Sequence, residues 1–284
     1  MTNLNDLITP CQPNWCPGCG DFAIWGAFKN AAVKEGWDNT NSVMVAGIGC
    51  HGHICNFTKI TAVEGLHGRP LPVATGIKSA NHKLNVFVFT GDGDSMAEGG
   101  NHFVHSCRRN HNLTIILHDN GIYGLTVGQT SPTSPHGFVT KSTPDGNPDY
   151  PISPMTLAIA SGATFVARGY AGDIPGLTEL IIKANNHDGL SLVDILQPCV
   201  TFNKEYTHQF YQANTYKLDE SHDVTNKAEA INKSLEWGPK KIALGILYEE
   251  KKPSYESQIP QIKDKPLIEQ SAVRDLSDLF KKYT

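Results

Sequence analysis

Five short apolar runs punctuate the chain, and each is nearly continuous rather than alternating between apolar and polar residues. Continuous runs rich in β-branched and aromatic side chains are typical of strands that are buried on both faces of a parallel sheet. We therefore predict five strands of one sheet. They cover residues 42–46, 85–90, 113–117, 163–167 and 192–196.

Between these runs, apolar residues recur at helical spacing, which places them on one face of a helix. The pattern predicts helices over residues 22–34, 95–109 and 174–186. Strands that alternate with helices are typical of an α/β fold with a doubly wound, mainly parallel sheet. We predict this fold for the chain.

Two long segments lie outside this alternation. Residues 128–154 are rich in Ser, Thr, Pro and Gly, and a loop of that length is usually functional or disordered. From Tyr248 the chain becomes polar and interrupted by prolines, and residues 268–280 form a short amphipathic stretch. We expect an N-terminal segment (1–40) with the first helix, an α/β core (41–203) and a C-terminal extension (204–284), laid over a neighbour or over its own domain.

The composition excludes several classes of protein. The 284 residues include 24 Lys and Arg against 28 Asp and Glu, a formal net charge of −4. A mildly acidic chain without a basic stripe is unsuited to nucleic acid. No apolar run approaches the roughly 20 residues that span a bilayer, and residues 1–10 lack the pattern of a signal peptide. We expect a cytoplasmic protein with no nucleic-acid or membrane partner.

Chemically active residues follow four of the five predicted strands. In open α/β sheets, ligands bind beyond the carboxyl ends of the strands. The segments that follow these strands supply Gly, Cys, Asp and Asn, and they are residues 47–50, 91–94, 118–121 and 197–199. Because all four segments supply such residues, we expect a ligand site at this edge of the sheet.

Gly91-Asp92-Gly93 and Asn120 end two successive predicted strands, at a spacing that fits one strand–helix–strand crossover. Carboxylate and amide oxygens suit Mg²⁺, which often also binds phosphate oxygens. The glycines let the backbone approach a phosphate, and the helix that starts near Ser95 offers free N–H groups. We predict a site for Mg²⁺ and a diphosphate. The segment is neither a nicotinamide fingerprint nor a Walker loop.

Four of the seven cysteines are candidates for one shared site. Cys16 and Cys19 form a C-x-x-C pair, and Cys50 and Cys199 each follow a predicted strand. Four thiolates suit either Zn²⁺ or a [4Fe–4S] cluster, and ligand softness does not separate the two. Cys107 lies in a predicted helix and is expected in the core. Three further side chains receive no assignment: Cys11, His53 and Cys55.

Nine segments carry a resemblance to a known family in their order and spacing. They are residues 15–20, 47–50, 66–76, 90–94, 99–102, 108–110, 119–126, 128–133 and 197–203. Gly-Asp-Gly followed by Asn resembles the motif of the thiamine-diphosphate enzymes. The whole set resembles the β subunit of the 2-oxoacid:ferredoxin oxidoreductases, and within it the 2-oxoglutarate-type (2-oxoglutarate synthase) branch. This resemblance implies a thiamine-diphosphate-binding fold for the core.

The resemblance also implies roles for individual residues. The implied ligands of a [4Fe–4S] cluster are Cys16, Cys19, Cys50 and Cys199. The implied ligands of Mg²⁺ are Asp92, Asn120 and the backbone of Ile122. The implied contacts of thiamine diphosphate are Ile48, Gly49, Cys50, His51, His67, Gly93, Asp94, Gly124 and Leu125. His67 or His51 would act in proton transfer, because imidazole titrates near neutral pH, with packing or cofactor contact as the alternative.

The implied reaction is the oxidative decarboxylation of a 2-oxoacid. The first choice of substrate is 2-oxoglutarate, which would be converted to succinyl-CoA and carbon dioxide. Electrons would pass through the cluster to ferredoxin, and coenzyme A would take the acyl group. No second α/β domain that could activate the cofactor's aminopyrimidine follows residue 203. The resemblance therefore implies an α subunit in an αβ or (αβ)₂ complex, with the C-terminal extension as an arm on that partner.

Three alternatives stay open. Val127 and residues 51–59 depart from the usual pattern where the substrate is expected, which leaves pyruvate or a branched-chain 2-oxoacid as the substrate. A non-redox thiamine decarboxylase or synthase subunit would leave the four cysteines without a role. A zinc-stabilised binding module without catalysis would leave Gly-Asp-Gly and Asn120 without a role.

Overall fold

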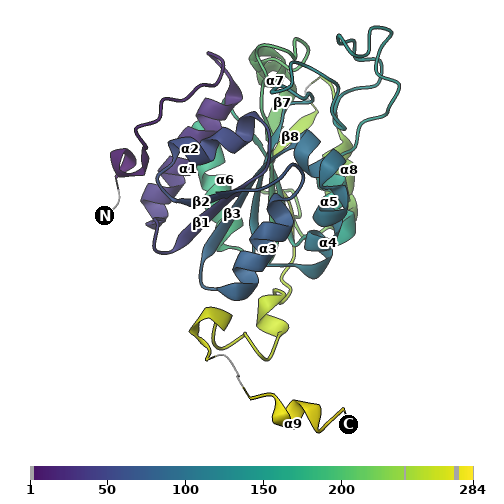
Figure 1. The fold of residues 1–284 in the computed structure, drawn as a ribbon. Helices are drawn as coiled ribbons and strands as arrows, with labels where there is room; N and C mark the ends of the chain where they lie inside the picture. The colour runs from purple at the N-terminus through teal and green to yellow at the C-terminus, as the bar shows by residue number, and fades with distance from the viewer. Residues whose placement is uncertain (1–2, 240, 272–274, 284) are drawn as a thin grey trace.

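The computed structural model describes residues 3–239, 241–271 and 275–283, and its centre is one twisted sheet (Figure 1). The described residues form strands β1 (Ser42–Ala46), β2 (Thr61–Glu64), β3 (Asn85–Gly91), β4 (Thr114–Asp119), β5 (Phe165–Tyr170), β6 (Ser191–Leu196), β7 (Thr215–Lys217) and β8 (Ile242–Glu249). Their spatial order is β2-β1-β3-β4-β6-β5-β8-β7. Neighbouring strands are parallel except β5 and β8, which are antiparallel. The predicted mainly parallel α/β fold is confirmed.

Helices cover both faces of the sheet. The longer ones are α1 (Gly20–Glu35), α3 (Pro70–Ala80), α4 (Gly100–Arg109), α5 (Pro154–Ser161), α6 (Ile174–Asn186) and α8 (Lys227–Leu235). On one face α1 packs beside α6, and on the other lie α3, α4, α5 and α8 (Figure 1). Each face encloses its own apolar core, which is the layered arrangement of a doubly wound sheet.

Short helical turns complete the described secondary structure. The α-helical ones are α2 (Ile54–Phe57), α7 (His208–Asn214) and α9 (Ser277–Phe280), and the 3₁₀ turns are Leu4–Leu7, Cys50–His53, Glu256–Gln258 and Leu267–Glu269. In the described residues, no helix combines the length and the apolar character that crossing a membrane requires.

The five predicted strands are all present, as β1, β3, β4, β5 and β6. The prediction for β5 began too early, at residue 163. Gly162 ends α5 in the left-handed conformation (φ 105°), and the amides of Gly162 and Ala163 still bond to carbonyls of that helix. Extended pairing therefore begins only at Phe165 and continues to Tyr170.

The structure adds three strands that the apolar pattern did not reveal. β2 lies at the edge of the sheet and is exposed along its whole length, so it carries no apolar run. β8 is interrupted by Gly245 (φ 130°), and its register with β5 shifts between Val166 and Ala167, as at a β-bulge. The sheet thus continues to Glu249, well past residue 203, where we expected the core to end.

The predicted helix over residues 95–109 consists of two parts. A π-helical turn (Gly93–Glu98) follows Asp92 directly, and α4 begins at Gly100. Single π-helical turns occur frequently at functional sites. Here the turn buries the side chains of Asp94 and Ser95.

The chain that follows β8 first packs on its own domain. The Tyr255 amide donates to the Asn110 carbonyl, and the Glu256 carboxylate lies 2.6 Å from His111 Nδ1. Ile262 is buried. In the later segment Pro266 is also buried and Glu269 pairs with Lys83, whereas residues 275–283 extend away from the sheet (Figure 1). The exposed apolar residues of that later segment include Leu267, Ile268, Leu276, Leu279, Phe280 and Tyr283.

Candidate active site

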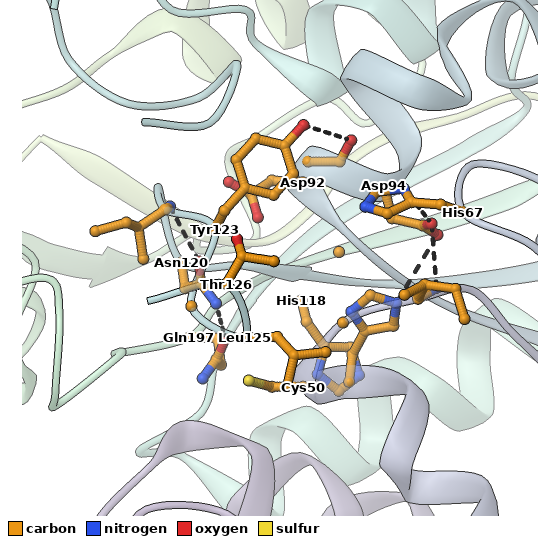
Figure 2. Close-up of a pocket in the computed structure, with 17 residues that line it drawn as sticks. Cys50, His67, Asp92, Asp94, His118, Asn120, Tyr123, Leu125, Thr126 and Gln197 are labelled. Atoms are coloured by element: carbon orange, nitrogen blue, oxygen red, sulfur yellow. Dashed lines mark hydrogen bonds and ion pairs between the residues drawn. The ribbon is translucent and has the colours of Figure 1, made fainter. Parts of the chain in front are cut away.

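The carboxyl ends of β1, β3, β4 and β6 enclose one cleft (Figure 2). All residues that the sequence predicted as contacts of Mg²⁺ or of thiamine diphosphate line this cleft. They are Ile48, Gly49, Cys50, His51, His67, Asp92, Gly93, Asp94, Asn120, Ile122, Gly124 and Leu125. The structure brings them together, and their contacts with a cofactor stay predictions.

Asp92 is the buried carboxylate of the cleft, with 3% of the residue exposed. Its Oδ2 accepts hydrogen bonds from the hydroxyls of Ser131 and Thr133, the latter at 2.7 Å. Burial raises the pKa of Asp92, and these hydrogen bonds oppose the rise. A buried carboxylate needs compensation, which a divalent cation would supply more fully than two hydroxyls. Asp92 therefore fits the predicted role of a Mg²⁺ ligand.

Asn120 is held in place by hydrogen bonds on both sides of its amide. Its Nδ2 donates to Gln197 Oε1 at 2.8 Å, and its Oδ1 accepts from the Ile122 amide at 3.0 Å. Gln197 also donates through Nε2 to the Cys19 sulfur at 3.2 Å. A continuous hydrogen-bonded path thus joins a predicted Mg²⁺ ligand to a predicted cluster ligand.

Asp94 binds the loops of the cleft to one another. Its Oδ1 accepts from the Ile48 and Gly68 amides, at 3.2 and 2.6 Å, and its Oδ2 accepts from Thr90 Oγ1 at 2.6 Å. A Cβ at Gly47 would lie only 1.8 Å from this carboxylate, so no larger residue fits there. Asp94 lines the cleft, but its oxygens accept hydrogen bonds that hold the neighbouring segments in position.

The two histidines with predicted catalytic roles differ in their surroundings. His51 is buried, and burial lowers its pKa to about 4. Its Nε2 lies 3.8 Å from the Asp94 carboxylate. The side chain of His67 is 37% exposed, and its Nδ1 lies 3.2 Å from Asp94. Both histidines line the cleft, and His67 is the more exposed of the two.

A buried pair of polar side chains at the cleft was missed by the sequence reasoning. His118 Nδ1 lies 2.6 Å from Asp21 Oδ1, and Asp21 Oδ2 accepts from the Cys19 thiol at 3.3 Å. His118 lines the cleft, as do Tyr123 and Gln197 (Figure 2). The position of His118 at the end of β4 was a signal for it, but nothing in the sequence pointed to Asp21 as its partner.

The four predicted cluster ligands line a second cavity, of about 230 Å³. Cys16, at the outer side, is exposed, and Cys199 is buried. A Cβ at Gly124 would lie 3.5 Å from the Cys199 sulfur and 3.8 Å from that of Cys50. The cavity is several times the roughly 30 Å³ that one water molecule occupies, so its size and its thiols fit a polynuclear cluster.

Burial favours the protonated form of two thiols of the cavity. Burial raises the pKa of Cys50 to about 12 and also raises that of Cys19. Binding of a metal would therefore release protons. Within the described residues, no three His, Cys, Asp or Glu side chains lie close enough together to hold a metal ion.

The remaining cysteines lie elsewhere. Cys107 is fully buried in α4 among apolar residues, as predicted. Cys11 is exposed and Cys55 half-buried, and these described residues line neither the cleft nor the cysteine cavity. His53 does line the cysteine cavity, where its Nδ1 lies 2.8 Å from Asn14 Oδ1.

Comparison with known proteins decides the family. Residues 47–195 match the family "Thiamine pyrophosphate enzyme, C-terminal TPP binding domain", and residues 199–264 match the C-terminal family of the pyruvate ferredoxin oxidoreductase beta subunit. A 2-oxoacid:ferredoxin oxidoreductase subunit beta from a Sulfolobus species is 49% identical over 266 residues, which cover 89% of this chain and 87% of the relative. The chain belongs to the β subunits of the 2-oxoacid:ferredoxin oxidoreductases. It is therefore part of an oxidoreductase with a ferredoxin acceptor.

Two further relatives of this β subunit are named for 2-oxoglutarate. The 2-oxoglutarate oxidoreductase subunit KorB of Mycobacterium tuberculosis is 46% identical over 198 residues, which cover 70% of this chain and 53% of the relative. A structure of 2-oxoglutarate:ferredoxin oxidoreductase from Magnetococcus marinus superposes with a TM-score of 0.92 at 35% identity, and the match covers 100% of this chain and 96% of that chain. The family likeness thus continues past residue 203, where the sequence motifs end.

Proposed function

We propose that this β subunit binds thiamine diphosphate with Mg²⁺ in the cleft and a [4Fe–4S] cluster in the cysteine cavity. The observation that carries the proposal is that the cleft and the cavity share a wall. Cys50, Gly124 and Leu125 line both. Electrons released from a substrate in the cleft would cross only this wall to reach the cluster.

The residues of this chain would place the cofactor rather than perform its chemistry. When bound, thiamine diphosphate supplies an electron sink for decarboxylation, and the cluster accepts electrons one at a time. Asp92, Asn120 and the Ile122 backbone would hold Mg²⁺ and through it the diphosphate. Asp94 keeps the surrounding loops in position. His67 is the candidate for proton transfer, because it is partly exposed at the cleft.

The substrate that we propose is 2-oxoglutarate, converted to succinyl-CoA and carbon dioxide with coenzyme A as co-substrate. Support comes from the KorB relatives and from the Magnetococcus structure, which has 2-oxoglutarate, coenzyme A and succinyl-CoA bound. We infer an α subunit that supplies the half of the site that grips the aminopyrimidine, and a ferredoxin that collects the electrons.

One observation favours the alternative of a monocarboxylate such as pyruvate or a branched-chain 2-oxoacid. Leu125 and Val127 are 46% and 60% exposed, and Leu125 lies at the wall that the cleft and the cysteine cavity share. Exposed apolar side chains beside the substrate would suit an apolar chain better than a second carboxylate.

Steady-state kinetics of the anaerobically purified complex would decide between these substrates. We expect kcat/KM for 2-oxoglutarate to exceed that for pyruvate and for 2-oxoisovalerate, with reduction of ferredoxin as the readout. A higher kcat/KM for either monocarboxylate would replace 2-oxoglutarate with the alternative. Zinc in place of iron, together with no turnover of any 2-oxoacid, would favour the non-catalytic binding module.

A further inference from the structure

Gln197 lines the cleft and contacts Cys19 of the cysteine cavity, and the proposed function gives it no role. It follows β6 directly, and its backbone amide donates to the Asp119 carbonyl at 2.8 Å, which continues the pairing of β6 with β4. Only 1% of the residue is exposed, although glutamines are mostly exposed in proteins. Burial of a polar side chain costs free energy unless its polar atoms are paired, so the partners of Gln197 indicate what it does.

Each polar atom of this side chain has a partner. Gln197 Oε1 accepts from Asn120 Nδ2 at 2.8 Å (Figure 2). Its Nε2 donates to the Cys19 sulfur at 3.2 Å and, in a longer contact, to the Pro198 carbonyl at 3.4 Å. An amide has an acceptor and two donors side by side, and here all three are in use. One side chain therefore contacts both a predicted Mg²⁺ ligand and a predicted cluster ligand.

The packing around Gln197 fixes its position. A Cβ at Gly20, the first residue of α1, would lie 2.8 Å from Gln197 Cγ and 3.1 Å from Pro198 Cδ. A larger residue at this position would therefore displace the glutamine. The Gly20 amide also donates to the Pro198 carbonyl at 3.2 Å, which holds the start of α1 against the end of β6.

At the cofactor end, Gln197 determines which atom of the Asn120 amide faces away from it. A carbonyl oxygen accepts hydrogen bonds and does not donate them, so Gln197 Oε1 pairs with Asn120 Nδ2 and not with Oδ1. Asn120 Oδ1 is thereby turned towards the Ile122 amide, at 3.0 Å. Without Gln197 the Asn120 amide could rotate by half a turn and present its NH₂ group, which repels a cation.

At the cluster end, the N–H of Gln197 is directed at a ligand sulfur. Reduction of a [4Fe–4S] cluster adds negative charge that is shared with the cysteine sulfurs, so an N–H donor stabilises the reduced state more than the oxidised state. Hydrogen bonds to the sulfurs are among the factors that set the reduction potential of such clusters, and they raise it.

We propose that Gln197 is a positioning residue for both groups. It turns Asn120 Oδ1 towards Mg²⁺, and it raises the reduction potential of the cluster through Cys19. Because this role needs Mg²⁺ in the cleft and a cluster in the cavity, it rests on the proposed function. Its consequence is that one substitution at Gln197 changes two centres at once.

Gln197→Met tests this role, because methionine has a similar length and volume but no N–H and no carbonyl oxygen. Redox titration of the anaerobic complex, followed by electron paramagnetic resonance, should give a lower reduction potential. We expect a tenfold change in the one-electron equilibrium, or about 59 mV. Titration calorimetry should show that Mg²⁺-dependent affinity for thiamine diphosphate falls by at least about tenfold, as is typical when a partner of a metal ligand is lost.

Gln258→Met is the matched control. Gln258 is exposed, and its Nε2 donates to the Pro253 and Ser254 carbonyls, away from the cleft and the cavity. This variant removes the same chemical groups and should keep both the potential and the cofactor affinity of wild type.

A second measurement uses wild type and does not depend on the folding of a variant. Pulsed electron paramagnetic resonance is recorded on the dithionite-reduced complex, with ¹⁵N in the glutamine side-chain amides. It should show coupling between the cluster and one amide nitrogen. The coupling should persist in Gln258→Met and disappear in Gln197→Met. If Gln197→Met fails to assemble, the wild-type spectrum decides: coupling supports the contact with Cys19, and its absence overturns the proposal.

The wild-type values separate this role from the proposed function. If wild type holds no cluster or binds no thiamine diphosphate, the proposed function fails, and the role of Gln197 fails with it. If wild type holds both, and Gln197→Met has the wild-type potential and the wild-type affinity, the role of Gln197 is overturned while the proposed function stands. A change at only one of the two centres would overturn the claim that Gln197 serves both.

Discussion

Asp92 and Asp94 lie two positions apart at the end of β3, yet their surroundings suit them to different tasks. The Asp92 carboxylate accepts hydrogen bonds from two hydroxyls of a loop, which a cation can replace. The Asp94 carboxylate accepts from two backbone amides and from Thr90. We infer that Asp92 binds the metal of the cofactor and that Asp94 keeps the cleft in shape.

Replacement of Asp92 should therefore affect the cofactor and spare the cluster. Asp92→Ala removes one oxygen ligand and its negative charge, so Mg²⁺ no longer screens the diphosphate. Titration calorimetry of the complex should show loss of Mg²⁺-dependent thiamine diphosphate binding, with unchanged iron content. Asp188→Ala, at an exposed site, serves as the control. Tight binding of the cofactor by Asp92→Ala would refute the assignment.

The cysteines allow a matched pair of variants. Cys199→Ala removes a thiol of the cysteine cavity and should abolish the visible absorbance of a [4Fe–4S] cluster and the reduction of ferredoxin. Cys107→Ala removes a thiol from the apolar core and should retain both, with a loss of stability of about 1 kcal/mol from the small cavity that it leaves. Iron and sulfide analysis checks this prediction, and a full complement in Cys199→Ala would be inconsistent with it.

Residues at strand ends were predictable from the sequence, and their partners were not. Asp92, Asn120 and Cys199 each follow an apolar run, and the ends of parallel strands meet at one edge. Ser131 lies 39 residues from Asp92, and Asp21 lies 97 residues from His118. No local pattern encodes such pairs, because they depend on how loops and helix ends fold over the edge.

At the scale of elements, buried strands were predictable because continuous apolar runs have few alternatives in an α/β chain. The edge strand β2 has no apolar run, and β8 is interrupted by Gly245 at positive φ, so their sequences do not resemble buried strands. The C-terminal region therefore contributes more to the sheet than its polar composition suggests. Tertiary pairing with β5 determines the structure of β8.

One buried carboxylate holds the segment after β8 against the domain. Burial raises the pKa of Glu256, but hydrogen bonds from His111 and the Asn112 amide outweigh it and hold this pKa below its usual value. A depressed pKa stabilises the fold above the unfolded pKa of roughly 4.3, and this contribution is lost as the pH falls through the folded pKa.

Glu256→Gln should therefore lower the free energy of unfolding at pH 7 by about 2 kcal/mol, the typical contribution of hydrogen bonds to a charged group. The difference from wild type should shrink as the pH falls below about 4. Urea unfolding of the isolated subunit at pH 7 and at a pH below about 4 measures this difference in the free energy of unfolding. Glu269→Gln breaks an exposed ion pair with Lys83 and should leave the midpoint unchanged. An equal difference at both pH values would contradict this account of Glu256.

At the scale of the whole molecule, we propose that residues 1–40 supply two ligands of the cluster and that residues 41–203 supply the other two and the cofactor site. Residues 204–284 would include the arm on the partner. The structure refines the last part: residues up to Glu269 contact the chain's own domain, and the later apolar residues Leu276, Leu279 and Phe280 are exposed. Exposed apolar side chains on a terminal segment are suited to an arm on the α subunit.

The isolated β subunit should consequently be inactive. When it is reconstituted with cluster, Mg²⁺ and thiamine diphosphate, it should reduce no dye with any 2-oxoacid, because we propose that the α subunit supplies the half of the site that grips the aminopyrimidine. Adding the α subunit should restore turnover, and deleting residues 264–284 should weaken the association of the subunits. Turnover by the β subunit alone, near the rate of the complex, would contradict this division.

The central claim is that cofactor and cluster lie on two sides of one wall in this subunit. Rapid-freeze electron paramagnetic resonance of the anaerobic complex, mixed with 2-oxoglutarate, tests it most directly. The account predicts the signal of a reduced [4Fe–4S] cluster in wild type and in Cys107→Ala. In Asp92→Ala the substrate should give no signal, whereas dithionite should still reduce the cluster. Absence of a cluster from wild type, or reduction by substrate in Asp92→Ala as fast as in wild type, would contradict the account.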